Sequence, residues 1–164
     1  MGDADAPWHS LAEFSGPTAK LSISSVNVRI ESSTPERLSF ITDYALTGPG
    51  QEGRHVLERY VLSANGVECK TTVTGGNTAM EYRAEFPVLI SDGASDLPVK
   101  KSAQAITVDD HGSRTSFALQ PSNVSGDLQL IGPRLVNHNG YLQRAVAPLK
   151  GPALTYTVTL DAPK

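Results

Sequence analysis

The sequence predicts an all-β protein, an antiparallel β-sandwich with about 10 to 12 strands. Apolar and polar residues alternate with a period of two along much of the chain, which is the pattern of strands with one buried face. Turn-forming residues separate these runs at short intervals, among them many of the 14 glycines and 11 prolines. No long stretch keeps the period of a helix. We therefore expect one β-sandwich domain over residues 1–164, with an irregular lead-in over residues 1–17.

The expected strands follow one another along the chain with turns between them. The first alternating run changes phase at Ser24-Ser25, which predicts a bulge at that point. The last run, residues 154–161, alternates apolar residues with threonines and is the most regular. In chain order, the expected strands lie within residues 20–31, 36–46, 54–64, 67–76, 79–90, 105–109, 115–120, 127–131, 134–138, 141–146 and 154–161.

Residues 54–76 predict a hairpin. Two alternating runs meet at Asn65-Gly66, a pair that favours a two-residue type I′ turn because both central positions take positive φ. This turn places Tyr60 opposite Thr71 and Glu58 opposite Val73. One face of the hairpin is then the more apolar and is predicted to point inward; it carries Val56, Glu58, Tyr60, Leu62, Val67, Cys69, Thr71 and Val73.

Glu58 is the charged residue on this inward face, and it has two interpretations. The preferred one places Glu58 near the end of the sheet, where it reaches solvent or pairs with an arginine and has no chemical role. In the other, Glu58 and Tyr60 are cleft residues, and the loss of solvent raises the pKa of the Glu58 carboxyl.

The same stretch resembles part of a known group of domains. An antiparallel pair followed by a strand ending in Phe-Pro is similar to the C-terminal β-supersandwich domain of heparinase II/III-like polysaccharide lyases and related carbohydrate-active enzymes. The resemblance covers about 35 of the 164 residues. The matching residues are Arg59, Leu62 or Ser63, Gly66, Val73, Gly75, Phe86 and Pro87.

This resemblance implies a supersandwich-like domain that packs on a catalytic helical toroid or on another β-domain. In that family the catalytic Tyr, His and Arg lie largely on the toroid. No catalytic residue is therefore carried over, and the catalytic residues of this chain stay unassigned.

A second candidate site is the hairpin expected around Asn139-Gly140. Its residues are of the types that bind sugars: an aromatic ring for the C–H face, and polar side chains for the hydroxyl groups. Two arginines there could bind the uronate or sulfate groups of an acidic polysaccharide in a bidentate manner. Trp8, the only tryptophan, is a further candidate, either as a stacking platform or as a core residue. The candidate ligand-binding set is Tyr141, Arg144, His138, Asn137, Arg134 and Trp8, and the preferred alternative is an ordinary polar hairpin.

The sequence predicts no metal site. The four histidines are scattered without ligand spacing. Asp109, Asp110 and His111 are adjacent on an expected turn, where neighbouring side chains rarely converge on one ion. We expect no cofactor, with calcium bound by loop carboxylates as the alternative. Cys69, the single cysteine, excludes an internal disulfide and is expected to pack as a small apolar group.

Charge and hydropathy limit the expected partners. The net charge of −3 argues against nucleic acid, which calls for a clustered basic surface. No apolar run is long enough to cross a membrane, so we expect no membrane partner. The remaining candidates are a polysaccharide and a neighbouring catalytic domain. We favour a periplasmic or secreted bacterial protein over a cytoplasmic one, although the single cysteine fits each of these locations.

Three functions are ranked on these grounds. The first is a non-catalytic β-sandwich domain of a carbohydrate-active enzyme, which positions substrate or braces a catalytic domain. The second is a stand-alone structural or interaction domain, of an adhesin-like or assembly type, which edge strands and a half-apolar outer face over residues 57–61 would support. The third is a small polysaccharide lyase or hydrolase that removes a proton next to a uronate. We leave the enzyme assignment open and favour a non-catalytic chain.

Overall fold

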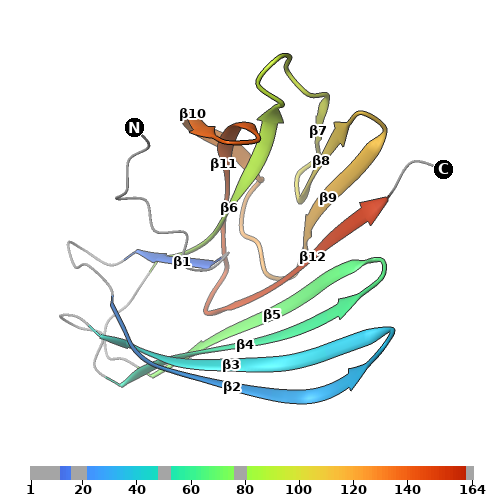
Figure 1. Ribbon diagram of the computed structural model, residues 1–164. Helices are drawn as coiled ribbons and strands as arrows, with labels where there is room; N and C mark the ends of the chain where they lie inside the picture. Colours follow the sequence, from blue (N-terminus) through green and yellow to red (C-terminus); the bar gives the residue numbers. More distant parts are fainter. Residues whose placement is uncertain (1–11, 16–21, 48–52, 76–80, 162–164) are drawn as a thin grey trace.

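The computed structural model describes residues 12–15, 22–47, 53–75 and 81–161, which form twelve strands and no helix (Figure 1). All of the strand pairs are antiparallel. The strands are β1 (Ala12–Ser15), β2 (Ser22–Thr34), β3 (Arg37–Thr47), β4 (Arg54–Ser63), β5 (Gly66–Thr74), β6 (Glu81–Ser91), β7 (Val99–Lys101), β8 (Ala105–Asp110), β9 (Ser113–Leu119), β10 (Gln129–Asn137), β11 (Gly140–Pro148) and β12 (Ala153–Asp161).

The strands form two sheets. The large sheet has eight strands in the order β2-β3-β4-β5-β12-β9-β8-β7, and the small sheet has four in the order β1-β6-β11-β10. In Figure 1 the large sheet is strongly curved: β2 to β5 form the lower layer, and β12, β9, β8 and β7 rise beside the small sheet. The predicted all-β antiparallel sandwich is therefore confirmed.

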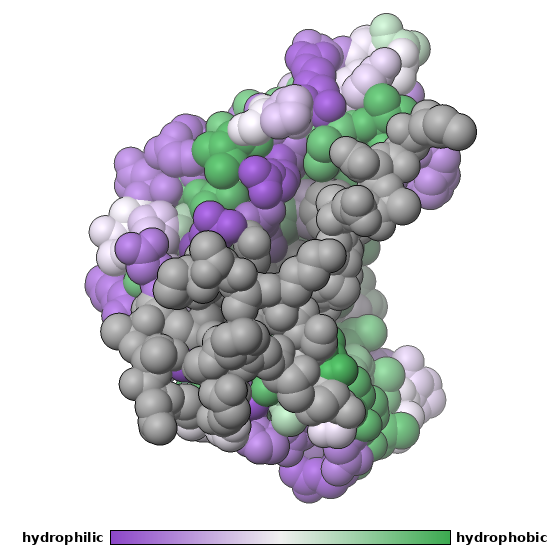
Figure 2. All heavy atoms as spheres, turned by 90° about the vertical axis from the view of Figure 1, so that its left-hand side faces the viewer, coloured by the Kyte–Doolittle hydropathy of each residue, from purple (hydrophilic) through white to green (hydrophobic). Residues whose placement is uncertain are grey.

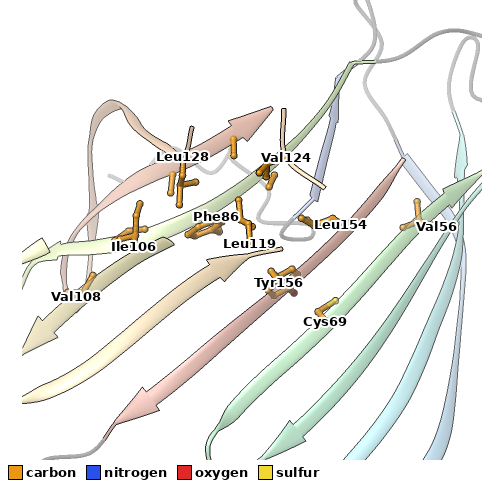
Figure 3. Packing of buried hydrophobic residues seen from close by; sticks show 14 of the residues in the cluster. Val56, Cys69, Phe86, Ile106, Val108, Leu119, Val124, Leu128, Leu154 and Tyr156 are labelled. Atoms are coloured by element: carbon orange, nitrogen blue, oxygen red, sulfur yellow. The ribbon is translucent and has the colours of Figure 1, made fainter. Parts of the chain in front are cut away.

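Apolar side chains fill the space between the two sheets. Phe86 of β6 stacks on Phe117 of β9, with ring centroids 4.8 Å apart, so an aromatic pair joins the sheets. Figure 3 shows buried residues of the segment between β9 and β10, Val124 and Leu128, near Leu119 and Phe86. We call the face of the large sheet that points to this core its inner face.

The hairpin β4–β5 keeps the predicted faces but not the predicted register. Ser63 lies opposite Gly66 and Glu58 lies opposite Thr71, a shift of two residues from the expected pairing. The turn residues are Ala64 and Asn65, neither of which has positive φ, and Gly66 takes a φ of +136° as the first residue of β5. Because side chains alternate with a period of two, a shift of two residues leaves every side chain on its predicted face.

Other expectations are confirmed or corrected strand by strand. The register of β2 against β3 shifts between Ile23 and Ser25, which confirms the predicted bulge. The two short runs 127–131 and 134–138 belong to one strand, β10, with an irregularity between Ile131 and Leu135. The lead-in expected to be irregular contains β1, and β7 was not predicted.

Candidate functional site

Glu58 is buried in the middle of the inner face. Only 5% of its surface is exposed, and β4 is the third strand from the edge of the large sheet. The hydroxyl of Tyr60 donates a hydrogen bond of 2.9 Å to Glu58 Oε2, and that of Thr42 donates one of 3.4 Å. The preferred interpretation of Glu58 is therefore wrong about its surroundings, because the carboxyl neither reaches solvent nor lies at the end of the sheet, and its hydrogen-bond partners are hydroxyl groups.

The surroundings of Glu58 favour its neutral form. Burial raises the pKa of the Glu58 carboxyl, and hydrogen bonds from Tyr60, Tyr44, Thr42 and Thr71 offset only part of that effect. These residues lie side by side because neighbouring strands place Thr42 and Thr71 on either side of Glu58. The alternative interpretation is thus correct on the direction of the pKa shift.

Two further groups continue this arrangement across β5 and β12. Cys69 lies opposite Tyr60 on one side and Tyr156 on the other, and its Sγ is 3.8 Å from Thr71 Oγ1. Figure 3 shows Cys69 and Tyr156 on these adjacent strands. Cys69 is fully buried, as predicted. We call this set the Glu58 cluster; it comprises Thr42, Tyr44, Glu58, Tyr60, Cys69, Thr71 and Tyr156.

The tyrosines and the cysteine of the Glu58 cluster favour their protonated forms. Burial, together with the charge of Glu58, raises the pKa of Tyr60, and burial also raises the pKa of Tyr156. Burial likewise raises the pKa of the Cys69 thiol. A tyrosine base or a cysteine nucleophile needs a pKa shifted the other way. These directions disfavour the two tyrosines as bases and Cys69 as a nucleophile.

The hairpin β10–β11 carries five of the predicted ligand-binding residues. Tyr141 is 37% exposed and lies beside Val136, which is 78% exposed. Asn137 accepts a hydrogen bond from the backbone N–H of Asn139 within the turn, and His138 is exposed at its tip. Trp8 lies outside the described residues.

Both arginines of this predicted site are held by carboxylates. Arg134 donates two hydrogen bonds to the carboxylate of Asp96, at 2.6 and 2.8 Å. Arg144 donates one of 3.0 Å to Glu85 of the neighbouring strand β6. An acidic polysaccharide would have to compete with these partners for each guanidinium.

The turn between β8 and β9 is tied to the loop after β6. His111 Nε2 lies 3.0 Å from Asp92 Oδ2, while Arg114 lies 3.3 Å from Asp109. Asp92 also accepts backbone hydrogen bonds from Ser95 and Ala94, which with His111 lower its pKa to about 2. Asp109 and His111 thus bind different partners. Among the described residues, no group of three or more His, Cys, Asp or Glu side chains could hold a metal ion.

Arg54 is a buried residue that the sequence analysis did not single out. It is 1% exposed and donates a hydrogen bond of 3.1 Å to the hydroxyl of Tyr82, which joins β4 of the large sheet to β6 of the small one. Arg54 lies two residues before Val56 and therefore points to the same, inner face of β4. The alternation along β4 could have predicted this burial, but a charged residue at the start of a strand is usually exposed.

At the edge of the large sheet, the inner face carries exposed apolar side chains. Val26, Val28 and Ile30 of β2 lie opposite Tyr44, Thr42 and Phe40 of β3, so they continue the inner face onto the outermost strand. Their exposed fractions are 60%, 58% and 65%. In Figure 2 hydrophobic side chains gather on the lower arm of the C-shaped outline, beside its hollow. We call Val26, Val28 and Ile30 the β2 strip.

Comparisons of the chain with models of known protein families and with curated proteins give no match. In the described part of the chain, no helix is long and apolar enough to cross a membrane.

Proposed function

We propose that this chain is a non-catalytic β-sandwich domain that works by packing the β2 strip against another protein surface. The observation that carries the proposal is the exposure of Val26, Val28 and Ile30, between 58% and 65%, on a face that is otherwise the core side of the sheet. A contiguous apolar surface of this kind marks a protein interaction site more often than isolated exposed residues do.

The candidate chemical groups support a non-catalytic role. Tyr60 and Cys69 have raised pKa values, which disfavours Tyr60 as a base and Cys69 as a nucleophile. Arg134 and Arg144 are each bound to a carboxylate. These observations weigh against the small lyase or hydrolase.

The resemblance to supersandwich domains supplies a setting for this role. In that setting the chain braces a neighbouring part of a carbohydrate-active enzyme, and polysaccharide is the substrate of the whole assembly. The β2 strip would then be the bracing surface. A stand-alone assembly domain would use the same surface, because the β2 strip is exposed on this chain whether or not a catalytic domain lies next to it.

A second candidate function is sugar binding at the β10–β11 hairpin, supported by the exposure of Tyr141 beside Val136. A tyrosine ring at this level of exposure can stack on the C–H face of a sugar. Since Arg134 and Arg144 are ion-paired, a neutral glycan fits this surface better than an acidic one.

The proposal is tested with the dye 1-anilinonaphthalene-8-sulfonate (ANS) and with polysaccharide substrates. At low protein concentration we expect the folded chain to bind ANS, and Val28→Thr to reduce the signal roughly by half, because it makes the centre of the β2 strip polar at constant shape. Val136→Thr is the matched control, an exposed valine on the other sheet, and should leave the signal nearly unchanged. We expect no release of unsaturated uronate or reducing ends.

Two results would contradict the proposal. One is an ANS signal that does not depend on Val28. The other is turnover of a polysaccharide that is lost in Glu58→Gln, which would make the Glu58 cluster an active site. Retardation in affinity electrophoresis that Tyr141→Ala removes would favour the sugar-binding candidate instead.

A further inference from the structure

Strand β2 is a long edge of the large sheet. Among the described strands it pairs on one side only, with β3, and it is 13 residues long. The other sheet edges are shorter or interrupted: β1 has four residues, β7 has three, and β10 contains Pro133. Short strands, prolines and inward-pointing charges are the usual means of preventing edge-to-edge pairing. Strand β2 contains no proline, its inner face carries no charged side chain, and its two register irregularities, at Ile23/Ser25 and Ile30/Ser32, flank the β2 strip without interrupting it.

We propose that a second copy of this chain pairs with β2, antiparallel and about a two-fold axis at Val28. This inference rests on the proposed function and names the partner of the β2 strip. The two large sheets then form one continuous sheet, and both inner faces lie on the same side of it, because the axis is perpendicular to the sheet.

The sequence of β2 is self-complementary in this register. Centring on Val28 places Val28 opposite its own equivalent and Val26 opposite Ile30 of the second copy. All three apolar residues of the strip then have an apolar partner across the interface, which is the stabilising arrangement for cross-strand pairs. An axis at Asn27 would instead place Ile30 opposite Ser24, where the register of β2 is already irregular.

The charges on β2 argue against an axis at Arg29. An axis at Arg29 would set two guanidinium groups directly opposite each other, which is destabilising. In the Val28 register Arg29 lies opposite Asn27 of the second copy. The Arg29 charge is also partly offset within its own strand, because it is close enough to Glu31 to contribute, after hydrogen bonds from Arg59 and Ser39, to the lowered pKa of that carboxyl.

Sedimentation of the full chain over a range of concentrations tests the second copy. We expect a monomer–dimer equilibrium, and we expect Val28→Lys to raise the dissociation constant by about tenfold or more, because it places two ammonium groups face to face at the axis. Val136→Lys is the matched control and should leave the constant within about twofold. Val28→Thr tests the same position with a residue of the same shape and should weaken the dimer to a smaller extent.

Cross-linking tests the register itself. Because the native Cys69 is buried, mild oxidation should not link wild-type chains. Val28→Cys should form a disulfide-linked dimer, since directly opposite Cβ atoms are about 4.5–5.5 Å apart, within a small adjustment of a disulfide. Val26→Cys should not, because two copies of residue 26 are then four residues out of step, about 13 Å along the strands. Equal cross-linking of both variants would overturn the Val28 register.

The outcomes separate this inference from the proposed function. A chain that stays monomeric at every concentration, yet binds ANS through Val28, overturns the second copy and leaves the strip as a site for another protein. A monomer whose ANS signal is independent of Val28 overturns both. A dimer that neither Val28→Lys nor Val28→Thr weakens would place the interface elsewhere and overturn the inference.

Discussion

Within the described part of the chain, the buried carboxyl of Glu58 is hydrogen-bonded by hydroxyl groups alone. Tyr60 and Thr42 donate hydrogen bonds to it, and neither carries a compensating charge. A buried carboxylate without a cation is costly, so the neutral acid is favoured and the pKa rises. Such a residue contributes to the fold mainly when it is protonated.

The pH dependence of stability should therefore carry the sign of a raised pKa. Between the ordinary value of 4.5 and the raised value, the folded chain binds more protons than the unfolded chain, so the free energy of unfolding falls as pH rises. Glu58→Gln keeps the shape and removes the titration. We expect the variant to gain stability relative to wild type between pH 4 and pH 8, as measured by urea unfolding.

Glu31 provides a control of opposite sign. Hydrogen bonds from Arg59 and Ser39 lower the pKa of this exposed carboxyl. Its contribution is present above the ordinary pKa and is lost as pH falls. Glu31→Gln should therefore lose stability relative to wild type as pH rises up to about 5, and the difference should stay constant at higher pH. The same trend in both variants would contradict the assignment of Glu58 as a buried, protonated group.

The sequence predicts the position of Glu58 better than its chemistry. Alternation along β4 puts Glu58 on the inner face, and this is confirmed. Its hydrogen-bond partner Thr42 comes from another strand, and Asp96, which binds Arg134, is 38 residues away from it. Such pairings depend on which strands become neighbours and on their register, and neither can be read from a local pattern.

At the scale of elements, the β4–β5 hairpin illustrates how distant contacts select a turn. Local preference predicts that Asn65 and Gly66 form the turn, but the structure uses Ala64 and Asn65. Gly66 instead begins β5, where it faces Thr159 of β12. A Cβ atom at this position would overlap the carbonyl oxygen of Val158. Gly66 is thus required by the neighbouring strand β12 as well as by the turn.

Gly66→Ala should be more destabilising than an ordinary glycine substitution. We expect a loss of about 2–4 kcal/mol in the free energy of unfolding, because backbone strain and steric overlap each cost about 1–3 kcal/mol. Gly53→Ala is the matched control: it also has positive φ, +72°, but a Cβ there meets nothing within 4 Å. It should cost only about 1 kcal/mol. Equal losses of stability in the two variants, measured by urea unfolding, would mean that the backbone of β12 does not limit the space at Gly66.

The elements that were predicted and those that were missed differ in a physical way. The bulge at Ser24-Ser25 and the long strands leave a period in the sequence, since one face of each is buried. Strand β7 has only three residues, and β1 has four, and each depends on a single neighbour, β8 or β6. Segments this short are fixed by the strand beside them rather than by their own pattern.

At the scale of the molecule, the two sheets are joined by side chains rather than by shared strands. Phe86 of the small sheet stacks on Phe117 of the large one, and Arg54 reaches from β4 to Tyr82 of β6. Among the described residues, the buried part of each sheet's inner face is covered by the other sheet and not by a further layer. The sheets are therefore expected to unfold together, in one transition.

Phe86→Ala tests this coupling. Removing a buried phenylalanine costs about 3–5 kcal/mol, a large part of the roughly 5–15 kcal/mol that stabilises a typical domain. We expect the urea midpoint to fall sharply while far-UV circular dichroism and tyrosine fluorescence still report one shared transition. Leu57→Ala, on the outer face of β4 and 42% exposed, is the control and should cost less than about 1 kcal/mol. Two separate transitions in Phe86→Ala would contradict the coupling. They would show that, once the Phe86–Phe117 contact is lost, one sheet can unfold while the other stays folded.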